Sequence, residues 1–272
     1  MKKVFTCWLV FLIATSGVSL AQDLQKESFW GIAVGIRSQN FQDQLVTQTK
    51  YSGGLLYFMI NHEKNKVDTW RKFNFEGGIG SMKSKAFESG QVPSRYLQPS
   101  VNSYWNEISY SHLFQIKSDA KSSIYVGPGI SHVISVRYSP RWDNSQINYE
   151  FSGNLQAEGR YLRAFGLWGK DMKASFTLKL PIVGYIARPG YSGVPEFLDH
   201  EKDFGPSLFD NTSVSWLGNF PRIQFDNYVE FPIAGGNKMQ VIYNWEYYSF
   251  QSPVTVNSAA HTIGVNFLMK AK

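Results

Sequence analysis

Residues 222–248 read RIQFDNYVEFPIAGGNKMQVIYNWEYY and carry the clearest pattern of the chain. Between Arg222 and Ile233, apolar side chains occupy alternate positions, with Asn227 as the one exception, and polar or charged side chains lie between them. The alternation stops in the turn Ala234 to Lys238 and resumes from Met239 to Tyr247. Because successive side chains of a strand point to opposite faces, this stretch predicts a β-hairpin with one apolar and one polar face.

Weaker versions of the same alternation run through the rest of the chain and predict about ten strands in all. Residues 55–60 are apolar on both faces, so the register of the second strand stays open. Pro128 lacks the N–H that a central strand donates, and it predicts a bulge or kink in the fifth strand. The predicted strands are 29–37, one within 51–61, 72–82, 104–116, 123–138, 148–161, 173–186, 222–233, 239–248 and 260–269.

The lengths of the connections alternate along the chain, depending on whether the preceding strand is even-numbered or odd-numbered. After even-numbered strands they are short (63–66, 117–121, 164–171, 234–238), and after odd-numbered strands they are mostly longer (42–50, 88–102, 139–147, 187–219), with 251–257 the brief exception. A soluble sandwich has no reason to sort its loops in this way. Short periplasmic turns and longer extracellular loops are typical of transmembrane β-barrels.

Composition supports the same fold class. Aromatic residues make up 16% of the chain, and no segment after Ala21 has the 18 or so consecutive apolar residues of a membrane helix. In lipid, only helices and closed barrels satisfy every backbone N–H and C=O. We therefore predict an all-β, transmembrane antiparallel β-barrel of about ten strands. Aromatic residues near predicted strand ends, such as Trp30, Trp70 and Trp105, fit interfacial girdles, although core positions fit them equally.

The N-terminus has the features of a secretory signal peptide. Lys2 and Lys3 precede a short apolar run, and Ser19-Leu20-Ala21 supplies a small-x-small cleavage site. We expect residues 1–21 to be cleaved, 22–28 to form a short periplasmic N-terminal segment, and 29–272 to form the barrel. Cys7, the only cysteine, leaves with the signal peptide, which excludes disulfides and thiolate chemistry in the mature chain.

The charge balance argues against a nucleic-acid partner. Loss of Lys2 and Lys3 lowers the formal net charge from +6 to +4, and the remaining basic residues do not cluster along the sequence. No spacing of histidines, cysteines or acids matches a metal motif, and no cofactor motif is present in the sequence. We expect no metal, no cofactor and no nucleic acid.

The signal peptide, the parity of the loops and a last strand 261–269 with Phe267 near its end resemble Gram-negative outer-membrane β-barrel proteins. The abundance of Tyr and Asn is similar to uncharacterised barrels of Bacteroidota-type bacteria. The resemblance implies an outer-membrane location, contact with outer-membrane lipid and lipopolysaccharide, and recognition of the last strand by the barrel-assembly machinery. Residues 268–272 depart from the pattern, because many such proteins end on the aromatic residue itself.

Charged residues of both signs fall on the predicted inner faces of the strands. A charge left unpaired in a narrow lumen costs several kcal/mol, so we expect a network of ion pairs that fills the barrel. A narrow path for ions or solutes is the alternative. The network residues are Lys72, Glu76, Glu107, Glu150, Glu158, Arg160, Lys179, Arg222, Asp226, Glu230 and Glu246.

The longest connection, 187–219, is the most informative candidate for function. Long loops are commonly lids, plugs or binding surfaces, and the aromatic residues of this one predict contact with a partner protein or with the barrel mouth. These aromatic residues are Tyr191, Phe197, Phe204, Phe209 and Trp216. They favour a non-enzymatic interaction or accessory role in an envelope protein complex, with other envelope proteins as partners.

The alternative function is an outer-membrane hydrolase, either a protease or a lipid-modifying enzyme, with its site at the extracellular rim. Its candidates in the longest loop are Asp199, His200 and Asp203, and Asp43 is an exposed acid in another predicted loop. For a lipid hydrolase, Ser258 with His261 is the first pair to test. None of these spacings matches a catalytic motif, so the sequence favours a protein without enzymatic activity.

Overall fold

The computed structural model describes residues 27–46, 48–66, 68–84, 100–139, 146–189, 208–252 and 254–271. The predicted signal peptide 1–21 and most of the loop 187–219 lie outside these residues. Within the described ranges, no helix is long and apolar enough to cross a membrane.

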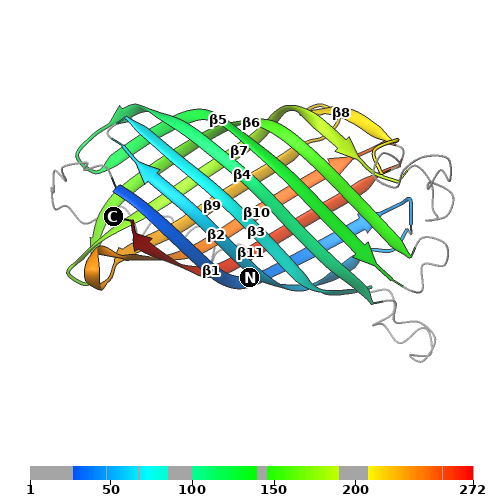
Figure 1. Ribbon diagram of the computed structural model, residues 1–272, viewed down its shortest axis with the longest axis horizontal. Coiled ribbons are helices and arrows are strands. Elements are labelled where there is room, and N and C mark those ends of the chain that lie inside the picture. Colours follow the sequence, from blue (N-terminus) through cyan, green and yellow to red (C-terminus); the bar gives the residue numbers. More distant parts are fainter. Residues whose placement is uncertain are drawn as a thin grey trace, which may run out of the picture.

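The described chain forms a single antiparallel sheet that closes on itself, with long tilted strands (Figure 1). Closure comes from the pairing of β1 with β11 and of β6 with β7, which leaves ten strands in the barrel; the short β8 pairs only with β7. The strands are β1 (Glu27–Asp43), β2 (Tyr51–Asn65), β3 (Thr69–Ser84), β4 (Val101–Ser118), β5 (Ser122–Tyr138), β6 (Ile147–Leu167), β7 (Lys170–Ala187), β8 (Thr212–Trp216), β9 (Arg222–Pro232), β10 (Lys238–Phe250) and β11 (Val256–Lys270).

The prediction of a closed antiparallel barrel of about ten strands is therefore confirmed. Most strands are longer than predicted, because the pairing continues beyond the apolar alternation. In β1, for example, the ladder begins at Glu27 and runs through residues 38–43, where the outward side chains are polar. The short strand β8 falls inside the longest predicted loop and was missed.

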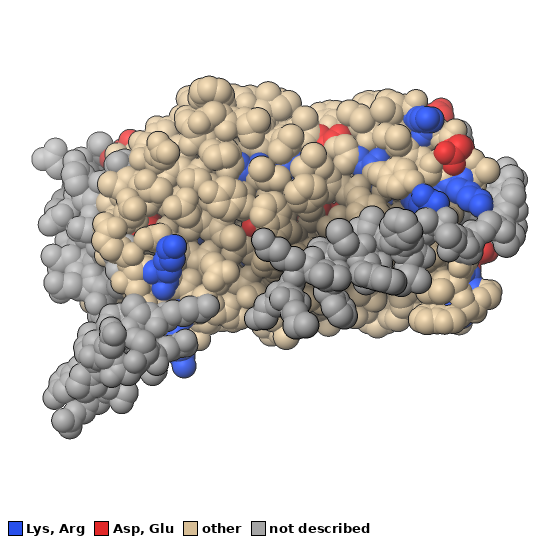
Figure 2. Space-filling model, turned by 180° about the vertical axis from the view of Figure 1, so that it is seen from behind, with Lys and Arg blue, Asp and Glu red and all other residues tan. Residues whose placement is uncertain are grey.

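Apolar side chains lie on the outside of the barrel and charged side chains on the inside, the reverse of their distribution in a soluble protein. On β1, Ile32 and Ile36 point outward and are 53% and 65% exposed, whereas Arg37 points inward and is 4% exposed. The open register of the second strand is settled with Leu56 outward and Leu55 inward. Figure 2 shows one outer face on which Lys and Arg lie mainly near the two ends of the barrel. Such an apolar outer band is the surface that a bilayer requires.

Two irregularities interrupt the ladders. One register shift falls between Gln115 and Lys117 on β4, and a second falls on β6 between Leu155 and Gln156. Pro128 is not at either shift: it stays in register with Ala157 of β6, so of the bulge or kink predicted at this proline, the bulge is wrong. Its missing N–H coincides instead with a gap in the β4–β5 ladder between the pairs Ser111–Gly129 and Phe114–Val126.

Tight turns join the strands at one end of the barrel, as the parity of the loops predicts. Between β6 and β7, Trp168 and Gly169 both have positive φ, 53° and 69°, which is the geometry of a two-residue hairpin turn. Between β4 and β5, the Asp119 carboxylate accepts hydrogen bonds from the Ser122 hydroxyl and from the backbone N–H groups of Lys121 and Ser122. These bonds, led by that of the Ser122 hydroxyl, lower the pKa of Asp119.

We predict that a charge in the middle of the apolar band is costly and a charge at the turns is not. Val34 is 58% exposed and is flanked by Val265 and Phe58. Val34→Arg should destabilise the inserted barrel by about 2–4 kcal/mol, because no water is available at that depth. Urea titration of folding into phosphatidylcholine vesicles measures this.

The matched control is Leu167→Arg at the turn end of β6, where the cost should be about 0–1 kcal/mol. Equal losses at the two positions would contradict a lipid-facing band.

Candidate functional site: the braced lumen and the extracellular rim

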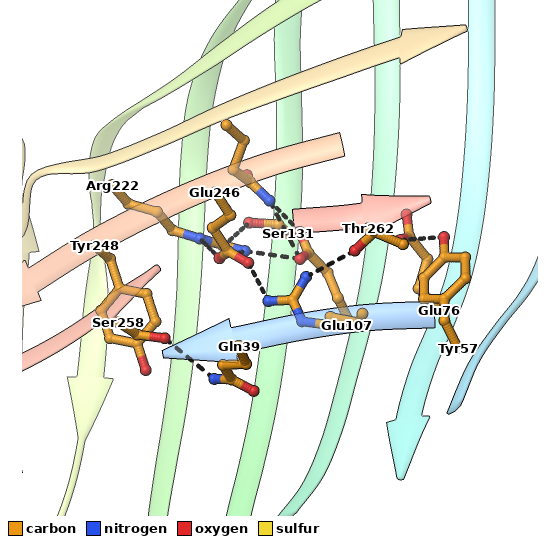
Figure 3. Close-up of polar contacts among 12 residues, drawn as sticks. Gln39, Tyr57, Glu76, Glu107, Ser131, Arg222, Glu246, Tyr248, Ser258 and Thr262 are labelled. Atoms are coloured by element: carbon orange, nitrogen blue, oxygen red, sulfur yellow. Dashed lines mark hydrogen bonds and ion pairs between the residues drawn. The ribbon is translucent and has the colours of Figure 1, made fainter. Parts of the chain in front are cut away.

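A brace of charged side chains crosses the middle of the lumen (Figure 3). Arg222, the first residue of β9, donates to Glu107 of β4 at 2.7 Å and to Glu246 of β10 at 2.8 Å. Arg37 of β1 donates to the other oxygen of Glu246 at 2.5 Å. Side chains of four strands, including β4 on the opposite wall, are thereby tied together.

Two tryptophans stack on arginines of the lumen. The guanidinium carbon of Arg37 lies 3.9 Å from the ring centroid of Trp105, and that of Arg160 lies 4.1 Å from the ring centroid of Trp70. Both tryptophans are buried, at 6% and 4% exposure, so of the two placements that the sequence left open, they take the core position and not the interfacial girdle. The inward position of Trp105 could have been predicted from the alternation of side chains, because residues two apart on a strand share a face and Glu107 was predicted to point inward.

A second ionic contact lies beside the brace. Lys179 of β7 donates to Asp226 of β9 at 2.5 Å, and the Tyr57 hydroxyl donates to Glu76 at 2.8 Å. The cavity between these groups and Arg37 has a volume of about 10 Å³. That volume is about one water molecule.

An outer layer of ion pairs lies toward the long loops. Arg137 donates to Glu150 at 2.8 Å, and Arg188 donates to Asp43 at 2.7 Å and to the carbonyl oxygens of Ser252 and Val254. Asp43 is 0% exposed, so its assignment as an exposed loop acid is wrong. The sequence interpretation missed this layer because Asp43 and Arg188 follow the apolar stretches that define the predicted strands.

A third layer lies toward the tight turns. Lys238 donates to Glu27 at 2.9 Å and lies 3.4 Å from Glu230, while Lys72 lies 3.3 Å from Glu63. The predicted network residues all lie on the inner face of the barrel. Arg37, Arg137, Arg188, Asp43, Glu27, Glu63 and Lys238 join it without having been predicted as members.

Two further predicted members are held by neutral side chains. Arg160 donates to the hydroxyl groups of Ser175 and Tyr228. Glu158 accepts hydrogen bonds from the Ser111 hydroxyl at 3.0 Å and from the Gln156 amide at 2.7 Å. A side chain at Gly129 would collide with this Glu158 carboxylate, so the glycine leaves room for the acid.

The extracellular end of the lumen is closed by an apolar cap that we call the mouth cluster. Its buried members come from eight different segments and pack together: Phe41, Tyr51, Met82, Val101, Ile186, Phe220, Phe250 and Val256. Below it, a cavity lined by residues that include Arg222, Glu246 and Phe220 has a volume of only about 20 Å³. At these two places in the lumen, the described side chains leave room for about one or two water molecules.

The candidate hydrolase residues do not assemble into a site among the described residues. Ser258 points into the lumen, where the Gln39 amide donates to it at 3.1 Å, whereas His261 is on the outer face, 2.9 Å from the Tyr243 hydroxyl. The pairing of Ser258 with His261 is therefore wrong, because an odd spacing on a strand places the two side chains on opposite faces.

The remaining hydrolase candidates and part of the predicted partner loop fall where the chain is not described. These residues are Asp199, His200, Asp203, Tyr191, Phe197 and Phe204. In the described part of the chain, no group of three or more His, Cys, Asp or Glu residues is arranged to hold a metal ion.

Two described aromatic residues of the predicted partner loop are exposed toward the long-loop end of the barrel, where Trp216 pairs with Val183 of β7. Phe209 is 47% exposed and stacks on Phe151, with 5.5 Å between ring centroids, and Trp216 is 56% exposed at the end of β8. β8 is held by its pairing with Val183–Ala187 of β7, and the Trp216 N–H donates to Asn219 Oδ1 at 2.8 Å. Folded backbone therefore presents both aromatic residues.

No protein-family model matches the chain, and no curated protein matches its sequence. Solved structures with similar folds include the attachment invasion locus protein Ail of Yersinia pestis, at 9% identity and a TM-score of 0.34 over 89% of this chain and 99% of that one. The transport unit of the autotransporter AIDA-I from Escherichia coli is 7% identical, with a TM-score of 0.38 over 96% of this chain and 96% of that one. The toluene transporter TodX of Pseudomonas putida is 6% identical, with a TM-score of 0.29 over 90% of this chain and 89% of that one. These neighbours are barrels, and nothing about the activity of this chain follows from them.

We predict that loss of the shared carboxylate of the brace destabilises the barrel strongly. Glu246→Gln removes the charge that Arg37 and Arg222 share, and both guanidinium groups are nearly fully buried. Removing one partner of a buried pair typically costs about 3–5 kcal/mol. Urea-dependent unfolding from vesicles measures the loss.

The control is Asp171→Asn, at an exposed position of β7 next to the tight turn, which should stay within about 0.5 kcal/mol of the wild type. The double variant Arg37→Met/Glu246→Gln should lose less than the sum of the two single changes, and strict additivity would show that the pair does not act as a unit.

Proposed function

We propose that the protein is an integral outer-membrane β-barrel with a non-enzymatic interaction or accessory role in an envelope protein complex. The observation that carries the proposal is the filled lumen: buried ion pairs cross it, the mouth cluster covers it, and the cavities at its centre have volumes of about 10 and 20 Å³. A barrel without an open interior acts through its outer surface and its rims.

An outer-membrane location is supported by the apolar outer band, by the tight turns at one end and by the predicted signal peptide. In this location, outer-membrane lipid and lipopolysaccharide surround the band. The barrel-assembly machinery would act during biogenesis on β11, whose Phe267 points outward and is 48% exposed.

The extracellular rim supplies the surface for other envelope proteins. Exposed aromatic residues that folded backbone holds in place are favourable anchors for a partner, since little entropy is lost when they are covered. Phe209 and Trp216 meet this description. Tyr191, Phe197 and Phe204 belong to the same predicted partner loop and are proposed to extend the surface.

A narrow solute channel is the competing function. Planar-bilayer conductance discriminates the two. The wild-type protein should give no steady conductance steps, because the brace and the mouth cluster both obstruct the lumen. Steady steps from the wild-type protein would replace the closed-lumen proposal with a channel.

We predict that the rim aromatics crosslink a protein partner in native membranes. A photoreactive phenylalanine analogue at Phe209 or Trp216 should give a discrete heavier species on irradiation. The matched control is the same analogue at Trp168, which is 85% exposed but lies in a turn at the opposite end of the barrel.

Crosslinks from Trp168 alone, or none from either rim position, would argue against the extracellular rim as the interaction surface. A hydrolase is tested separately: loss of an activity on Asp199→Asn/His200→Gln/Asp203→Asn, with the barrel still folded, would favour the enzymatic alternative.

A further inference from the structure

The outer surface of the barrel has a groove near its extracellular end, with a volume of about 430 Å³. It lies at the long-loop end of four neighbouring strands, where β1 and β10 end and β2 and β11 begin. The outward side chains that line it and carry its chemistry are Asn40, Lys50, Ser52, Tyr247, Asn257 and Ala259.

The strand register explains why the surface is hollow here. Asn40 of β1 pairs with Ala259 of β11 on one side and with Ser52 of β2 on the other, and Ala259 pairs with Tyr247 of β10. All four side chains point outward from one continuous row of pairs. Two short side chains, Ser52 and Ala259, therefore lie beside the longer Asn40 and Tyr247, which leaves a depression between taller walls.

The groove begins where the apolar band ends. Ile36 of β1, Ile263 of β11 and Leu56 of β2 are 65%, 61% and 65% exposed on the outer face. Toward the long loops, the outward positions on β1 become Ser38, Asn40 and Gln42. In a bilayer, this change from apolar to polar marks the boundary between acyl chains and headgroups. The groove is thus at the headgroup level of the leaflet on the long-loop side.

The side chains in the groove are suited to a phosphorylated sugar. Asn40 and Asn257 provide amide donors and acceptors for hydroxyl groups, Tyr247 provides an aromatic face and a hydroxyl, and Lys50 provides a positive charge. None of the described residues that line the groove carries a carboxylate. No other described residue binds the side chains of Asn40, Lys50 or Asn257 by a hydrogen bond or an ion pair, so their polar atoms are open to a ligand.

We propose that this groove binds the phosphorylated sugar headgroup of a glycolipid in the outer leaflet. Lys50 pairs with the phosphate, the two asparagines hydrogen-bond the sugar hydroxyls, and the acyl chains run down the apolar band over Ile36 and Ile263. The inference rests on the proposed outer-membrane location and adds a defined lipid site to it. A bound glycolipid here also occupies part of the surface beside the rim.

Native mass spectrometry of the purified chain in detergent tests the site with three lipids. These are bisphosphorylated lipid A, its dephosphorylated form, and phosphatidylglycerol as an anionic lipid without sugar. The wild-type chain should retain one lipid A molecule in preference to either of the other two. Preference for phosphatidylglycerol, or equal retention of all three, would overturn the assignment of a phosphorylated sugar.

Two matched pairs of variants locate the binding. Lys50→Gln should weaken lipid A binding by about tenfold, the typical value of one charge-assisted contact. Lys64→Gln, at an exposed lysine of β2 near the other end of the barrel, should not weaken it. Ala259→Trp fills the groove and should abolish the one-molecule preference. Ala157→Trp, at an exposed outward alanine on β6, should leave it unchanged.

Failure of this inference is distinguishable from failure of the proposed function. Vesicle insertion and barrel folding are measured on the same variants. A chain that inserts but binds lipid A equally in all four variants refutes the groove alone, while a chain that does not insert refutes the membrane location on which both proposals depend.

Discussion

The interior of this barrel is too crowded for water to screen charge, and that constraint shapes the structure. The carboxylate of Glu246 accepts from both Arg37 and Arg222, and Arg222 reaches across to Glu107. Because an unpaired buried charge costs several kcal/mol, each of these groups is stable only while the others are in place. Backbone ladders close the wall of the barrel, and the brace fixes the distance between walls that do not pair with each other.

The long loop after β7 contributes to the interior as well as to the rim. β7 pairs with β9 as far as Lys179 and with β8 from Val183, so β8 and β9 together form one interrupted strand. In the interruption, Phe220 turns inward and is 2% exposed in the mouth cluster, next to Tyr248 and Phe250. Arg222 follows two residues later and begins the brace. The same segment therefore caps the lumen and starts its ionic network.

The alternation of side chains was sufficient to predict the barrel and its two faces. In Arg222 to Glu230, parity alone separates the side chains that enter the lumen from those that face lipid, and the same rule holds on β1. Parity could also have placed Trp105 inside, had the aromatic residues been weighed strand by strand. The sequence analysis predicted which residues belong to the charge network better than it predicted which of them form ion pairs.

The choice of ion-pair partners depends on distances across the lumen, and a local sequence pattern carries no information about these distances. Arg222 and Glu107 lie on strands that do not pair, so their contact follows from the number of strands, their stagger and the closure of the sheet. Asp43 and Arg188 could not be found by apolar alternation, because the outward neighbours of both are no longer membrane-facing. Polar outward positions at the ends of long strands look like loops in a sequence, and in this barrel they include the walls of the groove beside Asn40.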